Sequence, residues 1–434
     1  MISPSNTTLY FHPTASRNNW RVRYPIFEFG YGIVLFITCT QLYRFPALWL
    51  GMQVTTAALA ALGLCYLALH KLRLQIGVRR VLLVVTVFLG LPIFSLLFVH
   101  DFPGRELGLQ LHYVILLFSS VIFFSYNRKG EKIFIPAFIL AAIALVVELA
   151  VPGIYDALKV QGAAQVYYGG RGGGLYLQPN SFSYNLAFLL LGVVVSLDGN
   201  RTKAMWCCII VYGLSMIFTA SRGGLLVGLL IIFCLYALAN PKLGVARLIS
   251  QSMLALFVLM TIVILSYYGA KTLTSLLGIV QFETLIDRLA EPLRQTIANL
   301  GTMEERANFQ KLYIERILEK PIFGYGIGSI DVLRSQMLLS GAAHNQYLQY
   351  LFHYGLVGVV LMSIFLRTLW HDLRQLSSSS NYNFNVLIFV SLCLICFGTN
   401  SVLQSQNFYI LMGLLLARSC QARVECSMLQ QRIR

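Results

Sequence analysis

The dominant pattern along the chain is a series of apolar runs of about 18 residues, each long enough to cross a membrane as a helix. Lipid offers no hydrogen-bond partner to the backbone, so such runs are expected to be helical, and they lack the alternation of a membrane β-barrel. The pattern predicts twelve spans, near residues 25–42, 46–69, 81–99, 109–126, 132–151, 182–197, 204–220, 222–239, 252–268, 346–366, 385–400 and 405–417. We therefore expect an all-α, polytopic membrane protein in which residues 1–434 form a single domain.

Composition and charge agree with this expectation. Hydrophobic residues make up 57% of the chain and charged residues only 12%, and a soluble protein of 434 residues cannot bury that much apolar surface. The net charge of +16 is compatible with nucleic-acid binding, but Lys and Arg concentrate at the termini and in alternate loops, where Asp and Glu are scarce. This is the positive-inside pattern. It predicts cytoplasmic termini, and we expect no nucleic-acid partner. The first 24 residues lack an apolar core of their own, so we also expect no cleaved signal peptide.

Two connections are much longer than the others, and the topology places both on the side opposite the termini. Residues 152–181 are rich in Gly and Tyr, and residues 269–345 separate the ninth and tenth spans. In the second loop, a helix is expected over 278–298, and Thr302-Met-Glu-Glu305 has the pattern of a capping box with Thr302 as N-cap. An amphipathic run follows, Pro321 ends it, and Gly324-Tyr-Gly-Ile-Gly328 predicts a turn segment. This large loop is expected to be a helical cap on the membrane surface.

Arg222 is the first candidate for chemistry. It lies in Thr219-Ala-Ser-Arg-Gly-Gly224, with apolar runs so close on both sides that almost no loop remains. A guanidinium at that depth is costly unless it faces a polar cavity or a counter-charge. The two glycines allow a ligand or another backbone to come close, and the start of a helix adds positive potential. This combination suits a phosphate, which arginine can bind with two hydrogen bonds. Snorkelling to the interface, or pairing with a structural carboxylate, are the alternatives.

Three further residues on the same predicted side are weaker candidates. Arg171 precedes three glycines whose amides can cradle an anion, although a flexible turn explains the pattern equally well. Pro179-Asn180 opens the sixth predicted span, with Asn180 or Ser181 as N-cap. Arg306 lies in the first turns of the expected loop helix and, taken alone, is more typical of a solvated surface charge.

His344 stands where the tenth predicted span leaves the long loop. A neutral imidazole there can accept a proton from an incoming hydroxyl, although a lone histidine at an interface is more often structural. Asn345 either caps the following helix or orients the ring, and His353 is expected to be a packing residue. No far-side group of His, Cys and carboxylates has metal-ligand spacing and no nucleotide-binding motif is present, so we expect neither a metal nor a cofactor.

Taken in order, these motifs resemble those of the O-antigen ligase and polymerase superfamily of the bacterial inner membrane. They are Arg171…Pro179-Asn180, Thr219-Ala-Ser-Arg222-Gly, Arg306, Pro321-Ile-Phe-Gly-Tyr-Gly-Ile-Gly328 and His344-Asn…Gly355-Leu-Val-Gly358, and they cover about residues 160–365. The resemblance implies a metal-independent glycosyltransferase of GT-C type that takes a glycan from undecaprenyl diphosphate. In a ligase the acceptor is the lipid A–core oligosaccharide, and in a polymerase it is another lipid-linked repeat unit.

The resemblance also implies roles for individual residues. Arg222 matches the diphosphate-binding arginine, Arg306 the arginine of the late loop, His344 the essential histidine and Arg171 the arginine of the earlier loop. We therefore expect Arg222 to neutralise the departing diphosphate and His344 to position or deprotonate the acceptor hydroxyl at the periplasmic face. A ligase is preferred because the late loop resembles one compact cap. A polymerase, and from another class a polysaccharide or lipid transporter, remain open.

Overall fold

The chain is described here by a computed structural model. It describes residues 25–45, 51–69, 78–98, 104–127, 129–151, 154–158, 160, 174–176, 178–197, 202–219, 224, 227–228, 231, 301–330, 345–374, 382–398 and 405–433. Within these ranges the regular structure is helical throughout, with no strand, as the sequence predicts.

The elements, in chain order, are α1 (Pro25–Thr40), η1 (Leu42–Arg44), α2 (Met52–Leu69), α3 (Val78–Val85), η3 (Thr86–Gly90), α4 (Leu91–Ser95), η4 (Leu96–Phe98), α5 (Gly104–Tyr126), η5 (Gly130–Ile133), α6 (Phe134–Ala150), α7 (Ile154–Ala157), η7 (Gly174–Tyr176), α8 (Pro179–Ser196), α9 (Thr202–Thr219), α13 (Gly301–Glu319), α15 (Gln346–Arg374), α16 (Tyr382–Gly398) and α17 (Gln406–Ile433). Each predicted span that falls on described residues is helical. The span expected at 252–268 and most of 222–239 lie outside the described residues, as does the helix expected over 278–298.

Three of the described helices are long and apolar enough to cross a membrane. They are Glu106–Tyr126, Gly130–Glu148 and Gln346–Leu373, and shorter apolar helices include Phe27–Thr40 and Ser181–Ser196. A hydrocarbon core of about 30 Å needs about 20 helical residues. The helical architecture therefore supports a membrane protein, while the number of twelve spans stays a prediction.

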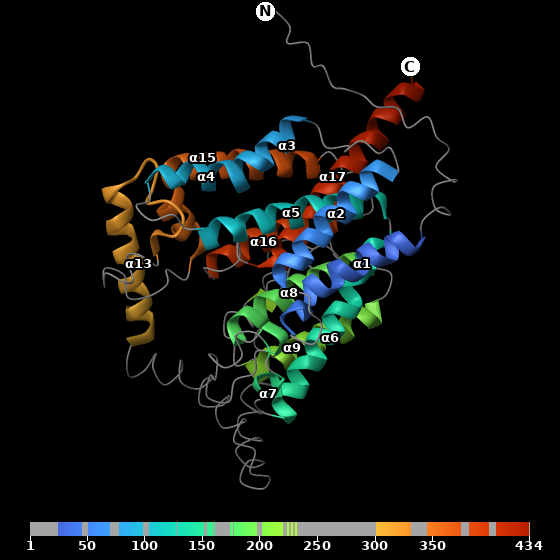
Figure 1. Ribbon diagram of the computed structural model, residues 1–434, viewed down its shortest axis with the longest axis horizontal. Coiled ribbons are helices and arrows are strands. Elements are labelled where there is room, and N and C mark those ends of the chain that lie inside the picture. The colour runs from blue at the N-terminus through green and yellow to red at the C-terminus, as the bar shows by residue number, and fades with distance from the viewer. Residues whose placement is uncertain are drawn as a thin grey trace, which may run out of the picture.

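At the centre of the bundle, α17 packs against both α5 and α8, and these three helices contact α1, α2, α6 and α16 (Figure 1). Small residues let these helices approach closely. A Cβ atom added at Gly192 of α8 would lie 2.2 Å from Cγ of Phe134 on α6, and one at Gly413 of α17 would lie 2.5 Å from Cβ of Ser120 on α5. Between α5 and α17, the rings of Tyr113 and Tyr409 stack with centroids 4.7 Å apart. Packing of this kind fixes the positions of the helix ends.

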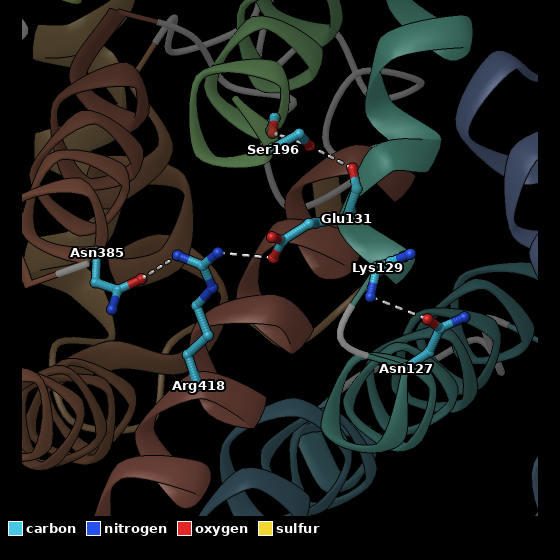
Figure 2. A network of polar contacts seen from close by, with 7 residues as sticks. Asn127, Lys129, Glu131, Ser196, Asn385 and Arg418 are labelled. Atoms are coloured by element: carbon cyan, nitrogen blue, oxygen red, sulfur yellow. Dashed lines mark hydrogen bonds and ion pairs between the residues drawn. The ribbon is translucent and has the colours of Figure 1, made fainter. Parts of the chain in front are cut away.

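A polar network ties one end of the bundle (Figure 2). Arg418 of α17 forms an ion pair with Glu131 of η5 at 2.7 Å, and its second guanidinium nitrogen donates to Oδ1 of Asn385 on α16 at 3.1 Å. The Ser196 hydroxyl, at the end of α8, donates to the backbone oxygen of Glu131. The positive-inside pattern predicts that this end is cytoplasmic.

At the opposite end, α13 runs steeply across the bundle and packs against the beginning of α15 (Figure 1). It ends at Glu319, two residues before Pro321, as predicted. Its start differs from the prediction, because Thr302 is already the second helical residue and so is not the N-cap. A capping-box pattern therefore does not define the first residue of this helix, because helix ends vary by one or two residues around such signals.

Candidate functional site

The structure describes the elements around the predicted site more completely than the site residues themselves. Arg171, Arg222 and His344 lie outside the described residues. Asn180 is the second residue of α8 and Arg306 the sixth residue of α13, but the positions of their side chains also lie outside what the structure describes. The geometry on which a site can be built is therefore that of α8, α9, α13 and α15.

Asn345 is the predicted site residue whose side chain is described, and it caps α15. Its Oδ1 atom accepts hydrogen bonds from the backbone amides of Tyr347 at 2.9 Å and Leu348 at 3.2 Å. These are the contacts of an N-cap residue, which satisfy two of the amides left unpaired at a helix start. The capping alternative is therefore confirmed. The cap fixes the start of α15 directly after His344, and a role of Asn345 in substrate binding stays a prediction.

Replacing Asn345 by Ala should lower the free energy of unfolding by about 1 kcal/mol, because the two amides lose their acceptor. Asn345→Asp should lower it by much less, since a carboxylate accepts the same bonds and favours a helix N-terminus. Thermal unfolding of the two variants in the same detergent provides the measurement. Equal loss in both variants would show that capping is not what the side chain contributes.

α15 is interrupted one third of the way along its length. Gly355 has φ 59° and ψ −159°, which breaks the helix into a first half, 346–354, and a second half, 356–374. A break of this kind leaves carbonyls of the first half and amides of the second half without helical partners. The segment Pro321–Gly328, called here the glycine loop, supplies those partners. Four backbone hydrogen bonds join them: Tyr325 N to Phe352 O (2.8 Å), Gly326 N to His353 O (2.9 Å), Leu356 N to Pro321 O (2.8 Å) and Val357 N to Ile322 O (3.2 Å).

The contact between the glycine loop and the break in α15 is called here the junction. Glycine is required on both sides of it. A Cβ atom at Gly355 would lie 2.3 Å from the carbonyl oxygen of Ile322, and one at Gly324 would lie 2.6 Å from the carbonyl carbon of His353. Both residues also have positive φ, 59° and 70°, which side chains disfavour. Backbone lies against backbone here, so neither contact can be relieved by rotating a side chain.

Side chains reinforce the junction. The ring of Tyr325 stacks on that of Phe352, with centroids 4.9 Å apart, and Tyr313 of α13 meets the same ring edge-on at 5.2 Å. His353 hydrogen-bonds through Nδ1 to the carbonyl oxygen of Gly326 at 2.7 Å. Sequence analysis had assigned His353 to packing, so it missed this polar contact. A histidine in an apolar run indicates a buried polar contact, but the local sequence does not identify the carbonyl oxygen of Gly326 as its partner.

The loop also holds the end of α13. The Tyr325 hydroxyl donates to Oε2 of Glu319, and Arg316 pairs with Oε1 of the same carboxylate at 2.6 Å. Burial and the neighbouring carboxylate raise the pKa of Tyr325 to about 12, so the phenol keeps its proton at neutral pH. The hydrogen bond from Tyr325, with the nearby arginine, lowers the pKa of Glu319. Consequently α13, which carries Arg306, and the first half of α15, which follows His344, are held as one unit.

A second contact brings the Arg222 motif against α8. A Cβ atom at Gly224 would lie 2.3 Å from Sδ of Met216 and 2.5 Å from Cβ of Ser183, and the hydroxyl of Tyr212 donates to the carbonyl oxygen of Gly224 at 2.8 Å. Ser183 follows Asn180 by three residues on α8. Gly224 therefore packs against side chains near the start of α8, and the expectation that a ligand or another backbone comes close to the two glycines stays a prediction.

Comparison with known families identifies the segment that contains these contacts. Residues 207–363 match the family model Wzy_C, described as O-antigen ligase. The match covers about a third of the chain and supports the O-antigen ligase superfamily. No curated protein matches the chain. The O-antigen ligase domain begins in α9 and ends in the second half of α15, so it includes Arg222, Arg306, His344 and the whole glycine-loop junction.

A buried polar network lies outside the O-antigen ligase domain and was missed by sequence analysis. It joins η1, α5, α8 and α17 near the first residues of α17. Its hydrogen bonds include Ser405 Oγ to Asn185 Oδ1 (2.6 Å), Asn407 Nδ2 to Asn185 Oδ1 (3.0 Å), Gln406 Nε2 to Tyr43 Oη (2.8 Å) and a contact of 3.1 Å between Gln406 Nε2 and His112 Nε2. Asn185 and His112 are polar residues inside predicted membrane spans, which signals a buried polar contact without identifying its partner. Within the described part of the chain, no group of three or more His, Cys, Asp or Glu side chains is arranged as a metal site.

Proposed function

We propose that this protein is an O-antigen ligase-type glycosyltransferase of the bacterial inner membrane. It moves a glycan from undecaprenyl diphosphate to a hydroxyl of the lipid A–core at the periplasmic face. The observation that carries the proposal is the O-antigen ligase domain, because it contains, in order, the arginines and the histidine that the chemistry needs. The described junction supports it further, since it holds the helix of Arg306 against the helix that follows His344.

The reaction breaks one bond and forms one. The bond between the anomeric carbon of the glycan and the diphosphate oxygen breaks, and its electron pair leaves with the diphosphate. A new bond forms between that carbon and the acceptor oxygen, whose proton is lost. Arg222, helped by Arg171 or Arg306, stabilises the charge that develops on the diphosphate. His344 positions the acceptor hydroxyl or takes its proton.

A polymerase of the same superfamily is the second candidate. It would use the same donor and the same residues, with a second lipid-linked repeat unit as acceptor. The ligase is favoured because the described part of the late loop, residues 301–330, is a single helix and a glycine loop docked compactly on α15.

Purified protein in detergent tests the proposal against both rivals. With lipid-linked glycan and lipid A–core, we expect glycan-modified core to appear, and chelation of divalent metals should leave the rate unchanged. Extension of the lipid-linked glycan in the absence of core would identify a polymerase. Transfer in detergent excludes transport as the explanation, because no compartments exist there. Failure of any transfer, with both substrates shown to be intact and the protein shown to be folded, would contradict the proposal.

A further inference from the structure

Exposed apolar side chains gather where α13 ends and the glycine loop begins. We call this group the interfacial patch; it consists of Ile314, Leu318, Ile322 and Phe323, which are 46%, 71%, 55% and 42% exposed. We propose that the interfacial patch is embedded in one leaflet of the lipid bilayer, so that the end of α13 and the glycine loop are inserted into the membrane. The glycosyltransferase function is not needed for this inference.

The faces of α13 have the arrangement of a helix lying in a membrane interface. Tyr313 and Ile317 point toward the protein and are buried. Ile314 and Leu318, one turn apart on an adjacent face, are exposed and apolar. Exposed polar residues lie beside this pair: Asn308 and Glu315 are on the next flank, and Lys311 is one turn before Ile314 on the same face. An apolar flank beside a charged flank is the pattern of a helix that partitions into the boundary between headgroups and acyl chains.

The interfacial patch continues onto α4, which belongs to the third predicted span. The rings of Phe323 and Phe94 meet at an angle of 60°, with centroids 5.8 Å apart. The amide of Ile327 donates to the hydroxyl of Ser95 at 3.2 Å, which fixes the glycine loop beside α4. Phe94 precedes the end of η4 at Phe98 by four residues, or about 6 Å along a helix. Phe323 therefore lies at the depth of a membrane-spanning helix, inside its end.

The interfacial patch also continues onto the second half of α15. Leu356, Val360 and Ile364 are 53%, 55% and 44% exposed, and they repeat every four residues, as a lipid-facing stripe does. None of the residues 346–354, all of which the structure describes, exposes a large apolar side chain. The lipid-facing stripe thus begins at the break, where Leu356 N donates to Pro321 O.

The length of α15 agrees with a membrane surface at this level. The candidate span Gln346–Leu373 has 28 residues, which is about 42 Å of helix, well beyond a hydrocarbon core of about 30 Å. A helix of this length extends beyond the acyl chains, which leaves room for the first half to stand above them; the span at 346–366 stays a prediction.

Charge supports a phospholipid leaflet as the occupant. Lys311 and Lys320 are exposed beside the interfacial patch, and Nζ of Lys320 lies 4.7 Å from the centre of the Tyr325 ring. Lysines at this position extend their ammonium groups toward headgroup phosphates while their stems remain in apolar surroundings. Tyrosine is enriched at the same depth. In this arrangement acyl chains cover the apolar flank of α13, and phospholipid headgroups cover its basic flank.

Tryptophan fluorescence in vesicles tests the proposal. Leu318→Trp and Phe323→Trp place a reporter in the interfacial patch, and Asn308→Trp places one on the polar flank of the same helix. The four native tryptophans give a background that the wild type measures. Each protein is reconstituted in phosphatidylcholine vesicles, with or without bromine near the headgroup end of the acyl chains. The emission added by Leu318→Trp or Phe323→Trp should fall at least about twofold in brominated vesicles, because an interfacial side chain reaches that depth. The emission added by Asn308→Trp should be unchanged.

Two results would overturn the proposal. The first is equal quenching of all three reporters, which would mean that α13 has no inserted flank. The second is that bromine quenches neither Leu318→Trp nor Phe323→Trp, although both variants keep their added emission when detergent is added. This result would mean that water or protein covers the patch. The lipid-linked donor is absent from these vesicles, so quenching reports the phospholipid leaflet alone.

Discussion

Arg222→Ala should reduce the initial rate of glycan transfer by about 100- to 1000-fold, the loss that follows removal of one group stabilising transition-state charge. The diphosphate gains charge as the glycosidic bond breaks, and an arginine at the predicted start of a helix between two apolar runs offers the matching charge. Arg222→Lys should retain part of the rate, because it keeps the charge and loses the two-point hydrogen bonding. Radiolabelled glycan transferred by equal amounts of purified protein provides the measurement.

Arg316→Ala is the matched control for this prediction. Arg316 lies on α13 and pairs with Glu319 at the surface, so its loss should leave the rate within about twofold of the wild type, as for most surface ion pairs. A wild-type rate in Arg222→Ala would remove this residue from the mechanism. A large loss of the transfer rate in Arg316→Ala would show that the assay responds to disturbance of α13 and the glycine loop and not to the loss of a specific charge.

Gly355→Ala should destabilise the protein by at least about 2 kcal/mol, since the side chain adds positive-φ strain and a collision between backbones. The new Cβ atom would lie 2.3 Å from the carbonyl oxygen of Ile322, so the glycine loop must leave the break or α15 must shift. Either movement exposes the four amides and carbonyls that the junction pairs, and it separates α13 from the first half of α15. We expect a lower unfolding temperature and loss of transfer.

Gly213→Ala is the control that α9 offers. A Cβ atom there has no heavy atom within 4 Å, and alanine favours a helix by about 0.5–1 kcal/mol over glycine. Its unfolding temperature should equal or exceed that of the wild type. If Gly355→Ala unfolds at the same temperature as Gly213→Ala and keeps its activity, the junction does not hold these elements together.

Sequence analysis placed most of the fold because its main rule is local. A run of apolar residues identifies a membrane helix, and Pro321 ends α13, without knowledge of any neighbour. Gly355 shows where such reasoning stops. The apolar pattern continues through 346–366, and what breaks the helix is hydrogen bonding with residues 321–326, some thirty positions earlier in the chain. Nothing in the local pattern predicts that pairing.

The site was predictable to a different extent. Arg222 and His344 could be singled out because charge and imidazole at a membrane boundary are physically unusual, and the order of the motifs pointed to the superfamily that the domain match then supported. For Asn345 the sequence left two roles, a cap of the following helix or an orienter of the imidazole ring, and the structure shows the cap. The carboxamides of Asn185, Gln406 and Asn407 could not be joined, because each has its partner on a distant helix.

The most direct test of the account measures both products of the same reaction. Purified wild type, Arg222→Ala and His344→Ala are each given undecaprenyl-diphosphate-linked glycan and lipid A–core in detergent. The amounts of glycan-modified core and of undecaprenyl diphosphate are then measured in the same sample. The account predicts equal amounts of the two products for the wild type and neither product for the two variants, all three proteins being folded to the same degree. Release of undecaprenyl diphosphate without modified core, or wild-type product formation by both variants, would contradict it.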